Sequence, residues 1–327
     1  MFGDVVGHER AKQILARTLS GRTIPSCLLF SGPPGVGKRR VADEFVRACL
    51  CLEQGPAPCG HCESCRLHGT GAHPDLLAVG PEEKKKHISV EQARALGAWI
   101  GSTPALGRRK AVIVDPADAL RSEGANALLK TLEEPPSGTV IVLVAARAGA
   151  LPATVRSRCQ QVPFGSLTDE EVAEVLRRNR WPAQAARQAA ALAEGSPGNA
   201  LGRDGKLWQE GSDAVRALLE NLASGGRGEA LAFAEGLGEG RERSLVALQA
   251  LIGFARAAAR RSLGDAAVTN SMVPGILQRL GTDEICGLLA GALETHRRLE
   301  GDRPPNVKLA FALLLSGAVA GGSGRRC

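Results

Sequence analysis

The segment Gly32–Arg39, which reads GPPGVGKR, follows the apolar run CLLF at Cys27–Phe30 and precedes a stretch with helical periodicity. A strand, a glycine-rich turn and a helix in this order are typical of a phosphate-binding P-loop, whose backbone N–H groups and helix N-terminus point at phosphates. The segment therefore predicts a P-loop α/β fold. The residues expected around the phosphates are Gly32, Gly35, Gly37 and Lys38, with the lysine reaching the β- and γ-phosphates.

The pattern around this loop predicts a doubly wound parallel sheet. Apolar runs without polar alternation suit strands buried on both faces, with helices as the crossovers between them. The expected strands are Cys27–Phe30, Leu76–Val79, Ala111–Val114, Val140–Ala145 and Gln161–Pro163. We assign residues 1–165 to this α/β domain, 166–203 to a small helical domain that begins at a cap on Thr168, and 204–327 to a larger helical domain.

Composition narrows the class of protein. A chain of 327 residues is too long for one ordinary domain, and its net charge of +7 is compatible with a nucleic-acid partner. The first ten residues lack the apolar core of a signal peptide, and the apolar run from Leu309 is too short to span a bilayer. We therefore expect a soluble, cytoplasmic protein without a membrane partner.

Two positions depart from what ATP hydrolysis needs. The P-loop pattern ends in Ser or Thr, whose hydroxyl binds Mg²⁺, but here Arg39 places a positive charge close to the metal position. Asp115 follows an apolar strand, as a metal-binding acid does, but Pro116 stands where a glutamate would position the attacking water. Asp118 lies three residues beyond Asp115 and need not point at the phosphate. The nucleotide site is therefore predicted to be degenerate, with ATP binding left open.

A cluster of cysteines at residues 49–65, CLCLEQGPAPCGHCESC, predicts a metal site. Four thiolates in a short loop match a closed, tetrahedral, structural zinc site. The expected ligands are Cys51, Cys59, Cys62 and Cys65, with Cys49 as the alternative to Cys51. His61 or His68 could replace one ligand, and an iron–sulfur cluster or uncoordinated thiols are further alternatives. The remaining cysteines are interpreted as isolated core or surface residues: Cys27, Cys159, Cys286 and Cys327.

Several motifs together resemble one family. VVGHERAKQIL at residues 5–15, NALLKTLEEPP at 126–136, LPATVRSRCQQVPF at 151–164 and PPNVKLAFALLL at 304–315 are similar to the AAA+ subunits of the bacterial clamp loader, which serves the replicative DNA polymerase III. The resemblance extends over nearly the whole chain. It implies an AAA+ fold with an inserted zinc module, a helical lid at 166–203 and an oligomerisation collar at 204–327.

Within this family, the chain resembles the non-motor delta-prime type more than the ATP-hydrolysing motor type. Arg39, Pro116 and Gly198 occupy the places of a threonine, a glutamate and a sensor arginine of the motor. Ser157, Arg158 and Cys159 match the SRC motif, so the resemblance implies that Arg158 is an arginine finger acting in a neighbour's ATP site. Arg156, two positions earlier, is the residue with which it is most easily confused.

The resulting hypothesis is a scaffolding subunit of the clamp loader with little or no hydrolysis of its own. Its implied partners are the motor subunits and the other non-motor subunit, and through the complex the sliding clamp and primed DNA. The first alternative is an ATP-binding or ATP-hydrolysing motor that uses Lys38 and Asp115. The second alternative is a zinc-stabilised nucleic-acid-binding protein that uses the cysteine module.

Overall fold

A computed structural model describes residues 2–300 apart from residues 22, 54, 56, 83, 84, 86, 202–204, 224–240 and 266–272. The chain divides into two compact units: Met1–Glu171 with Gly195–Gly198, and Val172–Glu194 with the residues from Asn199 onward. The three-domain division expected from the sequence stays a prediction. In the part of the chain that the structure describes, no helix is long and apolar enough to cross a membrane.

The first unit contains a parallel sheet with five strands in the described residues. These are β1 (Cys27–Ser31), β2 (Leu76–Val79), β3 (Lys110–Val114), β4 (Thr139–Ala145) and β5 (Gln160–Pro163), in the order β2-β3-β4-β1-β5. All five expected strands are confirmed to within one residue. Every residue of β3 and β4 is buried, because helices cover both faces of the sheet.

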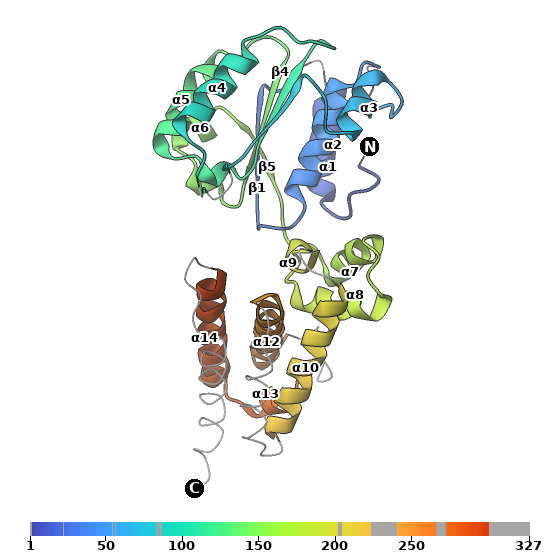
Figure 1. Cartoon of the computed structure of the whole chain (residues 1–327), viewed down its shortest axis with the longest axis vertical. Helices are drawn as coiled ribbons and strands as arrows, with labels where there is room; N and C mark the ends of the chain where they lie inside the picture. Colours follow the sequence, from blue (N-terminus) through green and yellow to red (C-terminus); the bar gives the residue numbers. More distant parts are fainter. Residues whose placement is uncertain are drawn as a thin grey trace. The chain divides into compact units, whose positions relative to one another are not determined.

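The helices of this unit form one layer on each side of the sheet (Figure 1). On one side lie α1 (Glu9–Ser20), α2 (Lys38–Leu50) and the short α3 (Glu63–Gly69). On the other side lie α4 (Val90–Ile100), α5 (Ser122–Glu133) and α6 (Ala153–Arg156). Each layer has its own apolar core: Leu15 and Phe45 pack with Phe30 of β1, whereas Leu96 and Leu128 pack with Val112 of β3. The expected doubly wound α/β arrangement is confirmed.

Local capping fixes where the helices begin. Ser89 and Gln92 form a capping box at the start of α4, in which the backbone N–H groups of both residues are satisfied by the other's side chain. Thr168 and Glu171 form the same arrangement at the start of α7 (Asp169–Arg178). Glu171 N donates to Thr168 Oγ1 at 3.2 Å, and Thr168 N donates to Glu171 Oε2 at 2.8 Å. The helix start that the sequence predicts at Thr168 is therefore confirmed.

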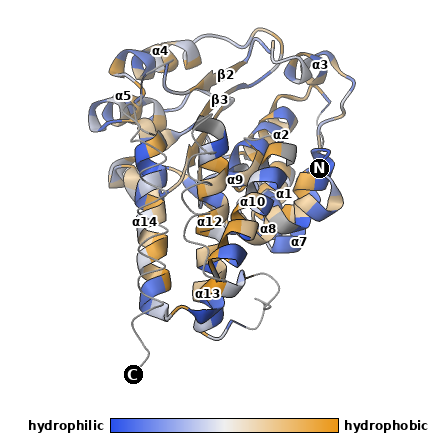
Figure 2. Cartoon of the chain, turned by 60° about the horizontal axis from the view of Figure 1, so that its bottom comes forward, coloured by the Kyte–Doolittle hydropathy of each residue, from blue (hydrophilic) through white to orange (hydrophobic). Residues whose placement is uncertain are grey.

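The second unit is helical in its described residues. After α7 come α8 (Ala183–Leu192), α9 (Gly198–Leu201), α10 (Gly205–Ala223), α12 (Arg241–Ser262), α13 (Gly275–Arg279) and α14 (Thr282–Glu300). Figure 2 shows apolar and polar residues interleaved along α10, α12 and α14, as expected of helices that bury one face. The buried faces of these helices form one apolar core, to which Leu219, Leu251 and Ile285 belong. The segment predicted as the final helices, residues 304–315, lies outside the described residues.

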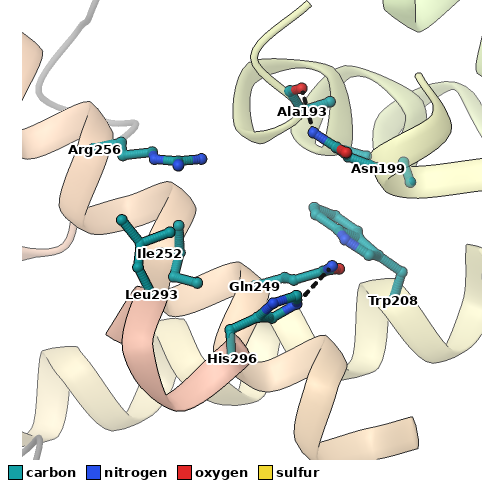
Figure 3. A pocket seen from close by; sticks show the side chains of 10 residues that line it. Ala193, Asn199, Trp208, Gln249, Ile252, Arg256, Leu293 and His296 are labelled. Carbon is teal, nitrogen blue, oxygen red and sulfur yellow. Dashed lines mark hydrogen bonds between the residues drawn. The ribbon is translucent and has the colours of Figure 1, made fainter. Parts of the chain in front are cut away.

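A cavity of about 180 Å³ lies within this second unit (Figure 3). Its wall includes the ring of Trp208 and the side chains of Gln249 and His296, whose Nε2 atoms are 3.1 Å apart. Arg256 also borders the cavity and forms an ion pair with Glu194 at 2.6 Å. Three alanines in the wall, Ala189, Ala193 and Ala200, leave space that larger side chains would fill.

Candidate functional site

The loop between β1 and α2 has the backbone of a phosphate-binding loop. Gly32, Gly35 and Gly37 have φ angles of 154°, 71° and 103°, a region in which other residues are strained. A side chain at Gly35 would also collide with Ser196 and Gly198, because its Cβ would lie 2.5 Å from Ser196 Oγ. The glycines are therefore required by conformation and by close packing. The loop leads directly into α2 at Lys38, as the sequence predicts.

Lys38 is bound to the loop itself. Its ammonium nitrogen donates hydrogen bonds to the carbonyl oxygens of Gly32 (2.7 Å) and Pro33 (2.6 Å). The residue is buried, and burial lowers the pKa of Lys38, against the opposing effect of Asp115 and Asp118. A phosphate at this loop would have to compete with the two carbonyl groups for the ammonium.

Arg39 lies between two acidic side chains, Asp43 and Asp115, the second of which is the acid expected to bind Mg²⁺. Its Nε donates to Asp43, 3.1 and 3.2 Å from the two carboxylate oxygens, and its Nη1 is 3.8 Å from Asp115 Oδ2. Burial raises the pKa of Asp115, while Arg39 and Lys38 act in the opposite direction. A divalent cation at Asp115 would meet the repulsion of the guanidinium, which at about 4 Å is on the order of 4 kcal/mol per unit charge at an effective dielectric of 20.

Asp118 does not take the place of the missing glutamate. The peptide before Pro116 is cis, and Asp118 lies in the 3₁₀ turn Ala117–Ala119 that follows it. Both carboxylate oxygens of Asp118 accept backbone hydrogen bonds beyond the end of β4, from Ala146 N (2.6 Å) and Arg147 N (3.2 Å). The carboxylate therefore serves the connection after β4.

The segment Gly195–Gly198 covers the phosphate loop. Gly198 N donates to Gly35 O at 2.9 Å, and Ser196 Oγ donates to Pro34 O at 2.7 Å. A Cβ on Gly198 would lie 2.6 Å from Gly35 Cα, so these two backbones touch. Sequence reasoning identified Gly198 as a replaced arginine but missed Ser196 and the contact. The sequence GSPG carried a signal, since paired glycines allow two backbones to approach closely.

Arg158 lies just beyond α6 and is bound by its own subunit. Its Nη1 donates to Thr154 O at 2.8 Å, and its Nη2 pairs with Glu133 Oε1 at 2.6 Å. Glu133 ends α5, where a negative charge is unfavourable to the helix dipole, so the arginine offsets this cost. Arg156 differs, because its Nε is buried. Glu133 was not singled out from the sequence.

The structure brings together Cys51, Cys59, Cys62 and Cys65, whose sulfur atoms all lie within 4.8 Å of one another. The Cys51–Cys62 and Cys59–Cys65 sulfur distances are 3.9 and 4.0 Å. A tetrahedral zinc with Zn–S bonds of 2.3 Å has sulfurs about 3.8 Å apart, so this donor set fits the ion. Cys49 is packed in the apolar core of α2, and His61 Nε2 pairs with Glu53 at 2.8 Å.

Backbone N–H groups donate to three of the four sulfurs, while burial raises the pKa of the Cys51 thiol and raises that of Cys65 to about 12. The N–H groups of Cys59, Cys62 and Cys65 point at the sulfurs of Cys51, Cys59 and Cys62, at 3.3–3.4 Å. Burial opposes ionisation of Cys62, but the N–H groups of Cys65 and Leu52 lower the pKa of its thiol to about 6. Hydrogen bonds of this kind orient metal ligands and favour the charged form that binds a cation.

A buried chain of hydrogen bonds joins this module to the sheet. Asp75 N donates to His73 Nδ1 (3.0 Å), His73 Nε2 lies 2.9 Å from Ser64 Oγ, and Ser64 Oγ donates to Leu50 O (2.7 Å). The acceptor role of Nδ1 places the proton of His73 on Nε2, and burial lowers the pKa of this histidine. The sequence did not predict this chain, because no local motif links Ser64 to His73 or to Leu50, which lie 9 and 14 residues away from it.

Cys27 and Cys159 are in contact, so the prediction that they are isolated is wrong. Both are buried in one apolar cluster, and their sulfur atoms are 2.7 Å apart. They meet because β5 pairs with β1 in a register that places Leu28 opposite Gln160. Cys286 is exposed, as expected of a surface residue, and Cys327 lies outside the described residues.

Comparison with known families and proteins points to DNA polymerase III. The family model described as "DNA polymerase III, delta subunit" matches residues 7–168. The DNA polymerase III subunit delta' of Escherichia coli is 35% identical over 256 residues, which cover 77% of this chain and 75% of that protein. Its counterpart in Pseudomonas aeruginosa is 38% identical over 192 residues. That match covers 57% of this chain and 58% of the Pseudomonas protein, less than two thirds of its length.

Two further matches have other names. The DNA polymerase III subunit tau of E. coli is 32% identical over 335 residues, which cover 97% of this chain and 50% of that protein. Among solved structures, a DNA polymerase III gamma-subunit-related protein from Thermotoga maritima aligns with a TM-score of 0.43 and 18% identity, over 95% of this chain and 99% of that one.

Proposed function

We infer that this chain, which belongs to the family of DNA polymerase III delta-prime subunits, is a non-motor subunit of a bacterial clamp loader. In this role it would scaffold the complex that places a sliding clamp on primed DNA, and it would hydrolyse little or no ATP. Its partners would be the motor subunits and the other non-motor subunit. The clamp and the DNA would be reached through the complex.

The observation that carries this inference is the occupation of the nucleotide site by the chain's own groups. Lys38 is bonded to two loop carbonyls, and Arg39 is paired with Asp43 beside Asp115. Phosphoryl transfer depends on a lysine at the phosphates, a metal ion and a positioned water. Here the lysine and the metal position are already engaged, and Pro116 has no group to orient the water. Nucleotide binding without hydrolysis remains compatible with the loop.

Arg158 would act as an arginine finger on the ATP of an adjacent motor subunit. A guanidinium supplied in trans stabilises charge on the transferring phosphoryl group, and in GTPases it is worth about 10³–10⁵ in rate. Arg158 is partly exposed beyond a short helix. Its bonds are to Thr154 and Glu133, both on the surface of its own subunit, so it could be released without disturbing the core.

The cysteine module would hold one structural zinc ion. Four sulfur ligands leave no position for water, so the ion would stabilise the connection between α2 and α3 without taking part in hydrolysis. The buried chain through Ser64 and His73 would transmit the position of this module to β2.

The test uses the complete chain reconstituted with its cognate motor subunits. The wild-type chain alone is expected to show no Mg²⁺-dependent ATP turnover, and adding it to the motor is expected to increase the motor's turnover. Arg158→Ala should abolish this increase, because the neighbouring site loses its arginine, whereas Arg156→Ala should retain it. Assembly of both variants is checked by gel filtration, so that loss of binding is distinguished from loss of stimulation.

Other outcomes would favour the other two functions. Mg²⁺-dependent turnover by the isolated chain that disappears in Lys38→Ala would identify a motor subunit. Tight DNA binding by the isolated chain that is lost in Cys62→Ser would identify a nucleic-acid-binding protein and overturn the scaffold proposal. If Arg156→Ala abolishes stimulation and Arg158→Ala does not, the finger has been assigned to the wrong arginine.

A further inference from the structure

Cys27 and Cys159 form a pair of thiols that neither the phosphate loop nor the cysteine module uses. Cys27 is the first residue of β1, and Cys159 immediately precedes β5. Because Leu28 lies opposite Gln160, the preceding residues of the two strands also lie opposite each other. Both side chains pack in the same apolar cluster, which places them on the same face of the sheet.

The geometry of this pair is compatible with a covalent bond. Neighbouring strands lie about 4.8 Å apart, within the range of about 4.4–6.8 Å between Cα atoms that a disulfide spans. The side chains already meet, since the two sulfur atoms are 2.7 Å apart. No rearrangement of the strands is therefore needed for a bond to form.

The two thiols have different chemical properties. Cys27 is 4% exposed, and its hydrogen bond to Cys159, together with burial, raises the pKa of its thiol. Cys159 is 9% exposed, and the same hydrogen bond lowers the pKa of its thiol, against the effect of burial. Cys159 is the more exposed of the two residues, so an oxidant in solution meets it first, and the lower pKa of its thiol favours the thiolate that attacks.

We propose that Cys27 and Cys159 are a redox modification site. The two cysteines form a reversible disulfide with each other, and a small-molecule disulfide, such as oxidised glutathione, is the oxidant. The Cys159 thiolate attacks one sulfur of the oxidant, forms a mixed disulfide and expels one thiolate. Cys27 then attacks the Cys159 sulfur, and the second thiolate leaves. The two protons of the cysteines pass to the two small thiols, so the protein loses two hydrogens and the oxidant is reduced.

The bond would connect β1 to the residue directly after Arg158. Arg158 is one position from Cys159, so the disulfide would anchor the segment that carries this arginine to the strand next to the edge of the sheet. The modification site itself does not depend on the proposed role of Arg158. Its existence can be tested on the isolated full-length chain.

The experiment exposes the reduced, zinc-supplemented chain to a series of reduced-to-oxidised glutathione ratios. Free thiols are then trapped by alkylation under denaturing conditions, and tryptic peptides are analysed by mass spectrometry. Trypsin places the two cysteines in the peptides Thr23–Lys38 and Cys159–Arg177, neither of which contains another cysteine. The expected product is a cross-linked pair of these two peptides, lighter by two hydrogens than their sum and cleaved by a reductant.

Two variants control the result. In Cys27→Ser the cross-link is expected to be lost and Cys159 to retain a glutathione adduct, with Cys27→Ala as the substitute if this variant does not fold. Cys286→Ser removes the exposed thiol on α14 and should leave the cross-link unchanged. The proposal is overturned if Cys27 and Cys159 stay alkylatable in the wild-type chain while Cys286 is glutathionylated. It is also overturned if either cysteine cross-links to the module instead, or if Cys159 stays unmodified in Cys27→Ser.

Discussion

Glu133 is the ion-pair partner of Arg158. The two side chains pair at 2.6 Å on a partly exposed surface, and such pairs are worth about 0.2–1 kcal/mol. Breaking the pair should therefore raise the fraction of unpaired Arg158 by at most about fivefold. We predict that Glu133→Gln lowers, by up to about fivefold, the concentration of this chain that gives half-maximal stimulation of the motor ATPase. The maximal rate should stay unchanged, because the guanidinium itself is intact.

Salt provides the control for this prediction. High ionic strength screens an exposed ion pair, so the difference between wild type and Glu133→Gln should shrink as salt is raised. Glu134, the next residue, is not paired with Arg158 in the structure, and Glu134→Gln is the matched variant expected to behave as wild type. If Glu133→Gln stimulates more weakly than wild type, Glu133 orients Arg158 for its task and does not restrain it.

Single residues were predictable from the sequence where the local motif determines their place. The loop glycines and Lys38 lie where a strand–loop–helix unit requires them, and Asp115 directly follows the strand β3. The contact of Arg39 with Asp43 was also predictable, because the two residues are four positions apart on one helix. The contacts of Glu133 with Arg158 and of Ser196 with Pro34 were not predictable, because each depends on the tertiary fold.

Among the elements, the loop before β3 depends on one buried carboxylate. Asp75 accepts hydrogen bonds from the backbone N–H groups of Ala105 (2.6 Å), Leu106 (2.8 Å) and Gly107 (3.4 Å). Burial alone would raise the pKa of Asp75, but these bonds bring it below its usual value. We predict that Asp75→Ala lowers the free energy of unfolding at pH 7 by about 2–4 kcal/mol, because buried N–H groups lose their acceptor.

The pH dependence of this effect has a definite sign. A carboxyl group whose pKa is lower in the folded state stabilises the protein above its unfolded pKa of about 3.9, and this contribution is lost as the pH falls through the folded value. The difference between wild type and Asp75→Ala in urea unfolding should therefore narrow below about pH 4. Asp4→Ala, at an exposed carboxylate, should stay within about 0.5 kcal/mol of wild type at pH 7. An Asp75→Ala protein as stable as wild type at pH 7 would contradict the assigned role.

The cysteine module makes a separate prediction about metal content. The purified chain should contain one zinc ion, measured by a colorimetric chelator after the thiols are blocked, because four sulfurs lie at tetrahedral spacing. Cys62→Ser should lower zinc affinity by more than tenfold, whereas Cys286→Ser should retain the ion. Removal of zinc should make residues 51–65 sensitive to protease, since the metal supplies the folding free energy of small modules. Full occupancy in Cys62→Ser would exclude this ligand set.

The strands and the cysteine cluster were predictable because each is defined by local spacing. Apolar runs indicated four of the five strands, whereas β5 has only one Val, Ile or Leu residue, Val162. The intervals between cysteines identified Cys59, Cys62 and Cys65 and left Cys49 as the alternative to Cys51. The Cys27–Cys159 pair was not predictable, because it depends on the register of two strands that are distant in sequence. The His73 chain was not predictable, because it depends on how neighbouring segments pack on one another. A single sequence carries no direct information on these contacts.

For the molecule as a whole, the alterations of the nucleotide site lie in three separate elements. Arg39 lies in the first turn of α2, Pro116 follows β3, and Gly198 begins α9 against the loop. The groups they replace act on one transition state, and residues that act as a unit have strongly non-additive effects. We therefore predict that Arg39→Thr, Pro116→Glu and Gly198→Arg, made singly, all fail to produce Mg²⁺-dependent ATP turnover above that of Lys38→Ala.

Each single substitution leaves a different part of the site unrestored. Arg39→Thr restores a hydroxyl for the metal but leaves the water without a carboxylate, and Pro116→Glu leaves Arg39 beside Asp115. Gly198→Arg adds a Cβ that would lie 2.6 Å from Gly35 Cα, so it should displace the covering segment and lower the melting temperature. Steady-state ATPase assays with each variant test the prediction, with binding of a fluorescent nucleotide measured in parallel to separate lost binding from lost chemistry. Turnover by Arg39→Thr alone would show that a single substitution silences the site, and the non-motor role would then rest on Arg158 alone.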